Sequence, residues 1–168
     1  MSFGSVVRRG HPILFSLLIL FSIIEMCIAA WLTAKYNSNH NFNTSGERAR
    51  VRYILFASIW TILFGFSYLI LFLVAAGSAL ASIASHFVFL AITWVVWLAA
   101  AAAITQTLGG ALNCKTNIVF VYCGQLNALE GFAWLIWVWV TIMLIVVLVR
   151  GITSAKQGDG YRGSLADE

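Results

Sequence analysis

The residue of this sequence best placed to do chemistry is Glu25, which stands in the middle of a long apolar run, residues 13–34. As a helix, this run would put the carboxyl group near the midplane of a bilayer. No Lys or Arg lies at a matching depth in the other apolar runs, so an ionised carboxylate would be costly there. We therefore expect Glu25 to be protonated and to hydrogen-bond a neighbouring helix. Candidate partners at similar depth are Tyr68, Thr93, Trp137 and Thr141.

Two interpretations of Glu25 are open. In the first, it is the intramembrane polar site of a small channel or transporter and binds a proton or a substrate. In the second, it is a neutral structural group that fixes the packing of helices. A pathway through a membrane needs several polar groups, and the sequence offers one acid at this depth. The structural interpretation is therefore favoured.

Two of the three cysteines, Cys114 and Cys123, flank a loop, whereas Cys27 lies inside an apolar run. The loop cysteines can form a disulfide if they face an oxidising compartment, and in the cytosol they would be free thiols. Their spacing differs from the CxxC that a thiol oxidoreductase would need. The apolar centre of the loop, residues 118–122, predicts that it folds against the rest of the protein. Elsewhere, Asn43 begins an N-x-S/T acceptor for glycosylation.

The other polar residues assemble no catalytic or metal site. Of the three histidines, His11 and His40 are predicted on opposite sides of the membrane, and His86 at the membrane interface. Gln106 and Glu130 fall at the ends of apolar runs, where solvation or capping is the usual role. The sequence has no P-loop, no HExxH motif and no Ser/His/Asp arrangement. It therefore predicts a protein that is not an enzyme, with no catalytic residue, no metal and no cofactor.

Composition indicates a membrane protein. Of the 168 residues, 61% are hydrophobic and only 10% are charged, whereas soluble domains have about 25% charged residues. Residues 53–108 include no Lys, Arg, Asp or Glu. A single helix of that length would far exceed the ~30 Å hydrocarbon core of a bilayer, so the stretch must fold back, most easily at the small residues 77–85. No basic stripe with interleaved aromatics is present, and nucleic acid is not an expected partner.

The elements that carry these residues are predicted to be four membrane-spanning helices. The fold class is thus an all-α integral membrane protein, a four-transmembrane-helix bundle. Residues 1–12 form a cytosolic head that ends with a helix break at His11-Pro12, and residues 151–168 form a flexible cytosolic tail. Gly109-Gly110 ends the third span. Within the four-span domain, residues 13–150, the spans are about 13–34, 53–76, 86–108 and 131–149.

Four spans place both termini on the same side of the membrane. Positively charged residues are equally frequent on the two sides, so the positive-inside rule does not decide the orientation. The Asn43 acceptor and the Cys114/Cys123 pair share the other side, and both make sense outside the cytosol. We therefore expect both termini to be cytosolic.

Several stretches, taken together and in this order, resemble fungal MARVEL-domain proteins. They are Arg50-Val51-Arg52-Tyr53, the His86–Gln106 span, Leu112-Asn113-Cys114, Tyr122-Cys123-Gly124-Gln125 and Ala128-Leu129-Glu130. The similarity covers about residues 7–152, and Cys114 and Cys123 match the loop cysteines of that family.

The resemblance implies a non-enzymatic tetraspan protein that acts in plasma-membrane domain organisation, membrane apposition, vesicle trafficking or cargo sorting. It brings no catalytic residues. Expected locations are the plasma membrane or secretory and extracellular vesicles. Expected partners are membrane lipids, identical copies in a homo-oligomer or lateral cluster, and membrane-protein cargo.

Overall fold

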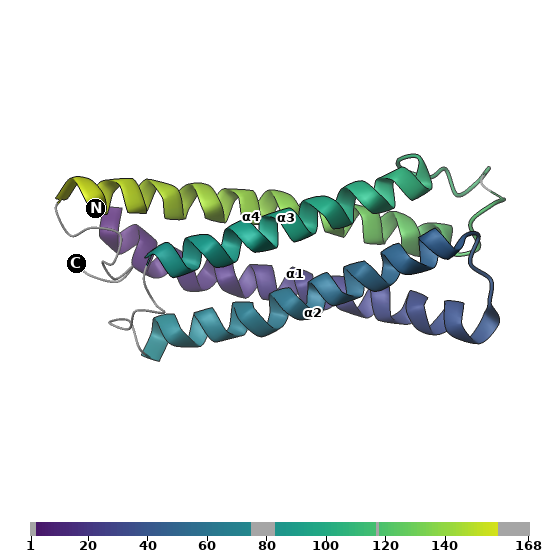
Figure 1. Cartoon of the computed structure of the whole chain (residues 1–168), viewed down its shortest axis with the longest axis horizontal. Coiled ribbons are helices and arrows are strands. Elements are labelled where there is room, and N and C mark those ends of the chain that lie inside the picture. The colour runs from purple at the N-terminus through teal and green to yellow at the C-terminus, as the bar shows by residue number, and fades with distance from the viewer. Residues whose placement is uncertain (1–2, 75–82, 117, 158–168) are drawn as a thin grey trace.

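The protein is a bundle of four long helices that lie side by side (Figure 1). The computed structural model describes residues 3–74, 83–116 and 118–157. Within these ranges there is no strand, and the helices in chain order are α1 (Phe3–Asn39), α2 (Ser45–Val74), α3 (Ile83–Leu108) and α4 (Cys123–Gln157). The α1–α2 and α3–α4 connections lie at one end, here called the loop end. The start of α1 and the end of α4 lie at the opposite, terminal end.

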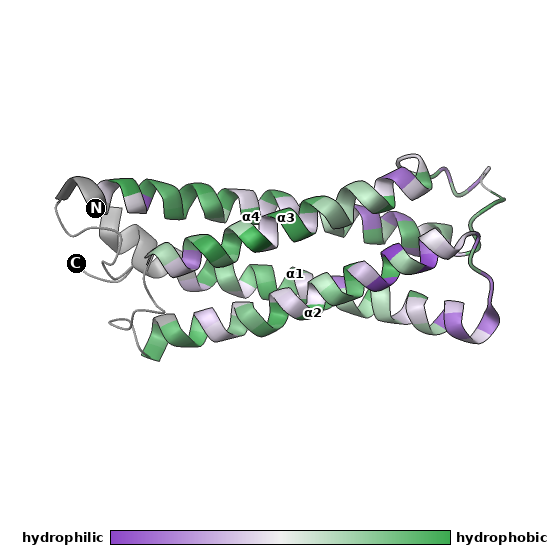
Figure 2. Ribbon diagram, in the orientation of Figure 1, coloured by the Kyte–Doolittle hydropathy of each residue, from purple (hydrophilic) through white to green (hydrophobic). Residues whose placement is uncertain are grey.

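Each helix includes a segment that is long and apolar enough to cross a membrane. These segments are Pro12–Asn39, Ser45–Leu71, Ala84–Leu108 and Cys123–Thr153. Figure 2 shows hydrophobic residues along the length of the helices and hydrophilic residues gathered toward the loop end. The predicted all-α bundle of four transmembrane helices is therefore confirmed.

The first helix begins earlier than the sequence predicts. A break was expected at His11-Pro12, but α1 starts at Phe3 and runs through Pro12 without ending. Proline removes one backbone donor and leaves the carbonyl one turn earlier unbonded. Because that carbonyl precedes the membrane-spanning segment, which starts at Pro12, water can satisfy it.

Three helices, α1, α2 and α4, extend beyond their predicted spans toward the loop end. The predicted polar connection between the first two spans shrinks to residues 40–44, because α1 continues to Asn39 and α2 begins at Ser45. Similarly, α4 begins at Cys123 instead of near residue 131. Apolar length marks the hydrocarbon region, whereas the helical backbone continues into the polar layer where its ends can be capped.

The third helix ends where the sequence predicts, at Gly109-Gly110. These glycines have φ angles of 75° and 99°, a left-handed conformation that side chains with a Cβ rarely adopt. The Gly109 amide donates to the carbonyl of Thr105 at 2.8 Å, which closes the helix end. Residues 75–82, most of the predicted turn, and 158–168, most of the predicted tail, lie outside the described residues.

The bundle core is formed mainly by α1 packed on α2 and by α3 packed on α4. Gly65 allows one close approach, because a Cβ at this position would meet Ile19 Cγ1 at 3.2 Å. The largest side chains that are fully buried are Trp97, Tyr36 and Phe15. Small residues at contacts of this kind let helices pack in lipid, where van der Waals contact is a main source of association.

Candidate functional site

Glu25 lies in the middle of the bundle and is fully buried. The contact of Ile19 with Gly65 sets the register of α1 on α2 and places the carboxyl group close to the level of Ser58. The Ser58 hydroxyl donates to the carbonyl of Ile54 in its own helix, at 2.9 Å. Neither carboxyl oxygen of Glu25 has a hydrogen-bond partner in the described part of the chain. The predicted bond to a neighbouring helix is therefore wrong.

The helices are linked near this depth by tryptophan and threonine instead. Each link runs from an indole Nε1–H on one helix to a threonine Oγ1 on another, so two neutral groups satisfy each other without a charge in the membrane. The three links are Trp60 to Thr93 at 3.3 Å, Trp94 to Thr141 at 2.8 Å and Trp97 to Thr61 at 2.9 Å.

None of the candidate partners is bonded to the carboxyl group in the described chain. Thr93 and Thr141 already accept an indole N–H. Tyr68 shares a hydrogen bond of 2.7 Å with the Ser85 hydroxyl. Trp137 Nε1 is buried and, like the carboxyl group, has no hydrogen-bond partner among the described residues. The result is an isolated acid with no hydrogen-bonded neighbour to which it could pass a proton.

At the loop end, a disulfide joins Cys114 to Cys123, with their Cα atoms 5.6 Å apart. This is the pair for which the sequence predicted a bridge. Beside it, the Asn127 side chain accepts from the Leu112 amide and donates to the Leu112 carbonyl, both at 2.8 Å. The connection between α3 and α4 is thus fastened to the start of α4 by one covalent bond and by one side chain. Cys27 is free and exposed on α1.

Tyr122 fastens the same connection to the end of α1. Its hydroxyl oxygen accepts from the side-chain amides of Asn41 at 2.9 Å and Asn39 at 3.2 Å. These two donors, Asn41 first, lower the pKa of Tyr122 below its usual value, because they stabilise the phenolate. The Tyr122 ring also lies 5.1 Å from the ring of Trp31 and 5.8 Å from that of Tyr36.

The apolar centre of this connection folds against the bundle only in part. Phe120 and Tyr122 pack against the hydrophobic core. Ile118 and Val121 are exposed, with exposed fractions of 97% and 66%. The prediction for residues 118–122 therefore holds for Phe120 and Tyr122, whereas Ile118, Val119 and Val121 are exposed.

A buried carboxylate that the sequence analysis missed organises the start of α2. Glu47 is 2% exposed; it accepts hydrogen bonds from the Tyr36 hydroxyl and from the Asn43 amide, the latter at 2.9 Å. Its own amide donates to Thr44 Oγ1 at 3.1 Å. Threonine followed three residues later by glutamate is a capping-box pattern, and this signal would have located the start of α2.

The predicted glycosylation acceptor lies at this helix start. Asn43 is exposed and directly precedes the capping residue Thr44. Ser45, the third residue of the acceptor, is also exposed and begins α2. The structure thus leaves the side chain of Asn43 open to solvent while its backbone amide is bound to Glu47.

Gln106 and Glu130 were predicted to be solvated or to cap helix ends, but the structure shows both in side-chain bonds between helices. Glu130 accepts from the Thr105 hydroxyl at 2.7 Å and so ties α4 to α3. The same hydroxyl accepts from Trp134 Nε1 at 2.9 Å. Gln106 accepts from Arg50 at 3.1 Å, which ties α3 to α2.

The histidines lie in different environments. His86 was predicted at the membrane interface, but it is fully buried. Its ring centroid lies 6.0 Å from that of Phe15 and 4.7 Å from that of Tyr68, so packing of the helix ends shields it. His40 is exposed at the loop end. In the described ranges, no three His, Cys, Asp or Glu side chains are grouped so as to hold a metal ion.

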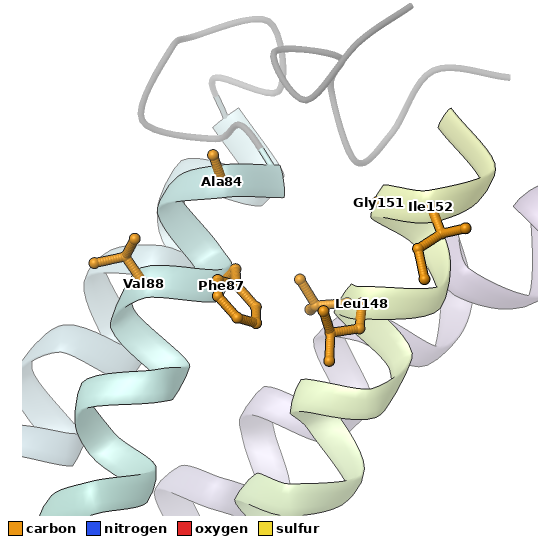
Figure 3. A pocket seen from close by; sticks show the side chains of 7 residues that line it. Ala84, Phe87, Val88, Leu148, Gly151 and Ile152 are labelled. Atoms are coloured by element: carbon orange, nitrogen blue, oxygen red, sulfur yellow. The ribbon is translucent and has the colours of Figure 1, made fainter. Parts of the chain in front are cut away.

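A groove opens between α3 and α4 at the terminal end, with a volume of about 270 Å³ (Figure 3). Side chains of Phe87 and Val88 lie on one wall, and those of Leu148 and Ile152 lie on the other. The lining residues are aliphatic or aromatic, or glycine, so the groove suits a hydrocarbon chain and offers no group for catalysis.

The bundle has four helices long and apolar enough to cross a membrane, a disulfide at the loop end, and exposed apolar side chains on its exterior. These features are expected of a membrane-embedded domain. Residues 6–147 match the MARVEL family, described as a membrane-associating domain. The chain belongs to this family. The matched residues include nearly all of α1, the whole of α2 and α3, and α4 up to Val147. Comparison with curated proteins and with solved structures finds no match.

Proposed function

We propose that this MARVEL protein organises the membrane around it and catalyses no reaction. It would do so in plasma-membrane domains, at sites of membrane apposition, or in vesicles during trafficking and cargo sorting. The orientation that goes with this proposal has both termini in the cytosol. The loop end, with the disulfide and the Asn43 acceptor, then faces outside the cytosol.

The observation that carries the proposal is the exterior of the bundle. Large apolar side chains are exposed on all four helices, among them Ile13, Leu63, Val95 and Ile145, with exposed fractions of 59%, 61%, 59% and 55%. In a membrane these side chains contact lipid tails or other helices. A protein whose apolar surface is spread over every helix can engage lipid, identical copies and cargo on several sides at once.

The same exterior supports self-association into a homo-oligomer or lateral cluster. Energy transfer between donor- and acceptor-labelled copies in liposomes tests this at several protein-to-lipid ratios. We expect transfer above that of randomly mixed monomers, and we expect it to persist when lipid is added. Transfer that falls to the random level on dilution would contradict assembly.

A channel or transporter is the second candidate, and Glu25 is the specific observation that favours it. A buried carboxyl group with no hydrogen-bond partner in the described chain is unusual enough to mark a functional site. The same liposomes test it through solute and proton flux. We expect flux equal to that of empty liposomes, whereas saturable flux that Glu25→Gln abolishes would replace our proposal with transport.

A further inference from the structure

The first two turns of α2 carry two arginines whose side chains meet at one neutral atom. The terminal nitrogens Nη2 of Arg48 and Arg52 donate to the side-chain oxygen Oδ1 of Asn37, at 2.7 and 2.8 Å. The two guanidinium groups therefore lie within two hydrogen-bond lengths of each other. Residues four apart on a helix share a face, and like charges at that spacing repel. The pair has one shared acceptor, and this acceptor carries no charge.

In the described ranges, neither arginine forms an ion pair. The buried Nε–H of Arg48 has no hydrogen-bond acceptor. Of the carboxyl groups that the structure describes, Glu25 lies in the bundle centre, Glu130 is bound to Thr105, and Glu47, the residue before Arg48, is bound to Tyr36. The arginine pair thus has an excess of positive charge and an unused donor.

The pair is held in place before any ligand arrives. The Arg48 guanidinium lies 5.3 Å from the centroid of the Phe42 ring, in a cation–π contact. Asn37 fixes the ends of both side chains from the neighbouring helix. Fixed side chains lose less entropy on binding, so a site of this kind binds more tightly than two mobile arginines would.

Arg50 provides an internal contrast. It lies between the two in the sequence, but it points to α3, where it donates to Thr107 and to Gln106. Its donors are used in packing two helices together. Within residues 48–52, Arg50 therefore has a structural role, whereas Arg48 and Arg52 both donate to the side-chain oxygen of Asn37.

The depth of the pair indicates the ligand. The candidate membrane span of α2 is Ser45–Leu71, and its uncharged stretch begins at residue 53, so Arg48 and Arg52 lie just before the hydrocarbon region, where a bilayer has its headgroups. The planar fork of a guanidinium matches the oxygens of a phosphate, and the start of a helix adds partial positive charge. We propose that Arg48 and Arg52, positioned by Asn37, bind a phosphate group, carried by a lipid headgroup at the membrane surface.

This site goes beyond the proposed organising function, because it assigns a ligand chemistry to named residues and does not require copies of the protein to associate. Binding is measured by thermophoresis on the full chain in a non-ionic detergent. Three probes are used: dioctanoyl phosphatidylglycerol, inorganic phosphate and dioctanoylglycerol, which lacks the phosphate.

The test variant is Arg48→Gln/Arg52→Gln, and the charge-matched control is Arg50→Gln/Lys115→Gln. We expect the test variant to bind phosphatidylglycerol at least about tenfold more weakly, since each hydrogen bond to a charged group contributes at least that factor. The control should stay within about twofold of the parent, because diffuse surface charge adds little at physiological salt. Dioctanoylglycerol should bind weakly to the parent and to both variants, with an affinity that does not depend on Arg48 and Arg52.

Circular dichroism and a monodisperse elution profile verify that the variants fold. If the double variant does not fold, Arg52→Gln alone serves, because Arg52 is exposed and its side-chain bond within the described residues is the one to Asn37. An affinity that this substitution leaves unchanged would overturn the proposal. Equal weakening in test and control variants would also overturn it, as would equal binding of dioctanoylglycerol. If phosphatidylglycerol binds more tightly than inorganic phosphate, the result supports a lipid headgroup as the ligand. If the two affinities are equal, the ligand of the same site is a soluble phosphate.

Discussion

The two ends of the bundle are held together by different kinds of interaction. At the loop end, a disulfide joins Cys114 to Cys123, and Tyr122 and Glu47 bind side chains or backbone from other segments. Toward the terminal end, Tyr68 shares a hydrogen bond of 2.7 Å with Ser85, and Trp139 donates to the carbonyl of Leu14 at 3.1 Å. There, α3 and α4 leave an apolar groove between them.

This difference indicates how rigidity is distributed along the molecule. Polar and covalent links fix the relative positions of the helix starts and ends at the loop end. At the terminal end, α3 and α4 line an apolar groove, where lipid tails can replace helix contacts at little cost. We therefore expect the loop end to be rigid, and we expect the helices at the terminal end to separate and repack more easily.

The largest effect should come from Glu47→Ala at the loop end. The substitution leaves the buried Tyr36 hydroxyl and the Asn43 amide without their acceptor. Losing hydrogen bonds to a charged group should lower the free energy of unfolding by about 3 kcal/mol. Denaturant unfolding in micelles measures it, with Glu47→Gln as a control that keeps one acceptor. A loss below about 1 kcal/mol would show that the stability of the loop end does not depend on this carboxylate.

The disulfide should have the next largest effect. For a loop of this length, the chain-entropy account gives about 2–3 kcal/mol, so Cys114→Ser/Cys123→Ser should destabilise by that amount. Cys27→Ser is the control, and it should change the stability little, because Cys27 is free and exposed. Peptide mapping without reductant should find the loop cysteines linked to each other. Two free thiols in oxidised protein would contradict both the bridge and the proposed orientation.

The same chemical change at the two ends sharpens the comparison further. Tyr36→Phe removes a donor from a buried carboxylate, whereas Tyr68→Phe removes a bond to a partly buried hydroxyl. We expect losses of about 2 kcal/mol and about 0.5–1 kcal/mol respectively, because bonds to charged groups are the stronger ones. Thermal unfolding of both variants in one detergent measures the difference. Equal losses would mean that the ends do not differ in their polar links.

The smallest effect is expected between the two ends, at Glu25. Glu25→Gln keeps the shape and breaks no hydrogen bond, since the carboxyl oxygens have no partner in the described chain. Glu25→Leu removes an unsatisfied polar group, so it should be neutral or slightly stabilising. Stability and assembly of parent and Gln variant should agree across pH 5–8, because an ionised carboxylate at this depth would be costly. A parent-specific change with pH would show that the carboxyl group titrates and would reopen the transport interpretation.

Several residues show how far sequence reasoning reaches here. The break after Leu108 was predictable, because Gly109-Gly110 allows a conformation that other residues rarely adopt. The start of α2 could have been predicted from Thr44 and Glu47, whose spacing is a capping signal. The lack of a hydrogen-bond partner for Glu25 in the described chain could not have been predicted. Depth along one helix does not tell which face of a neighbouring helix turns toward it.

The sequence by itself determined the number of spans and the class of protein, since both depend on apolar length, which is a local property measured against the thickness of a bilayer. It also placed the cysteine pair and the end of α3. Only the tertiary structure decided that Glu25 has no hydrogen-bond partner among the described residues, that His86 is buried, and that Arg48 and Arg52 meet at Asn37 while Arg50 turns to α3. These facts depend on how four helices are rotated and set in register against one another, and almost uniformly apolar helices carry little sequence pattern that records such rotation.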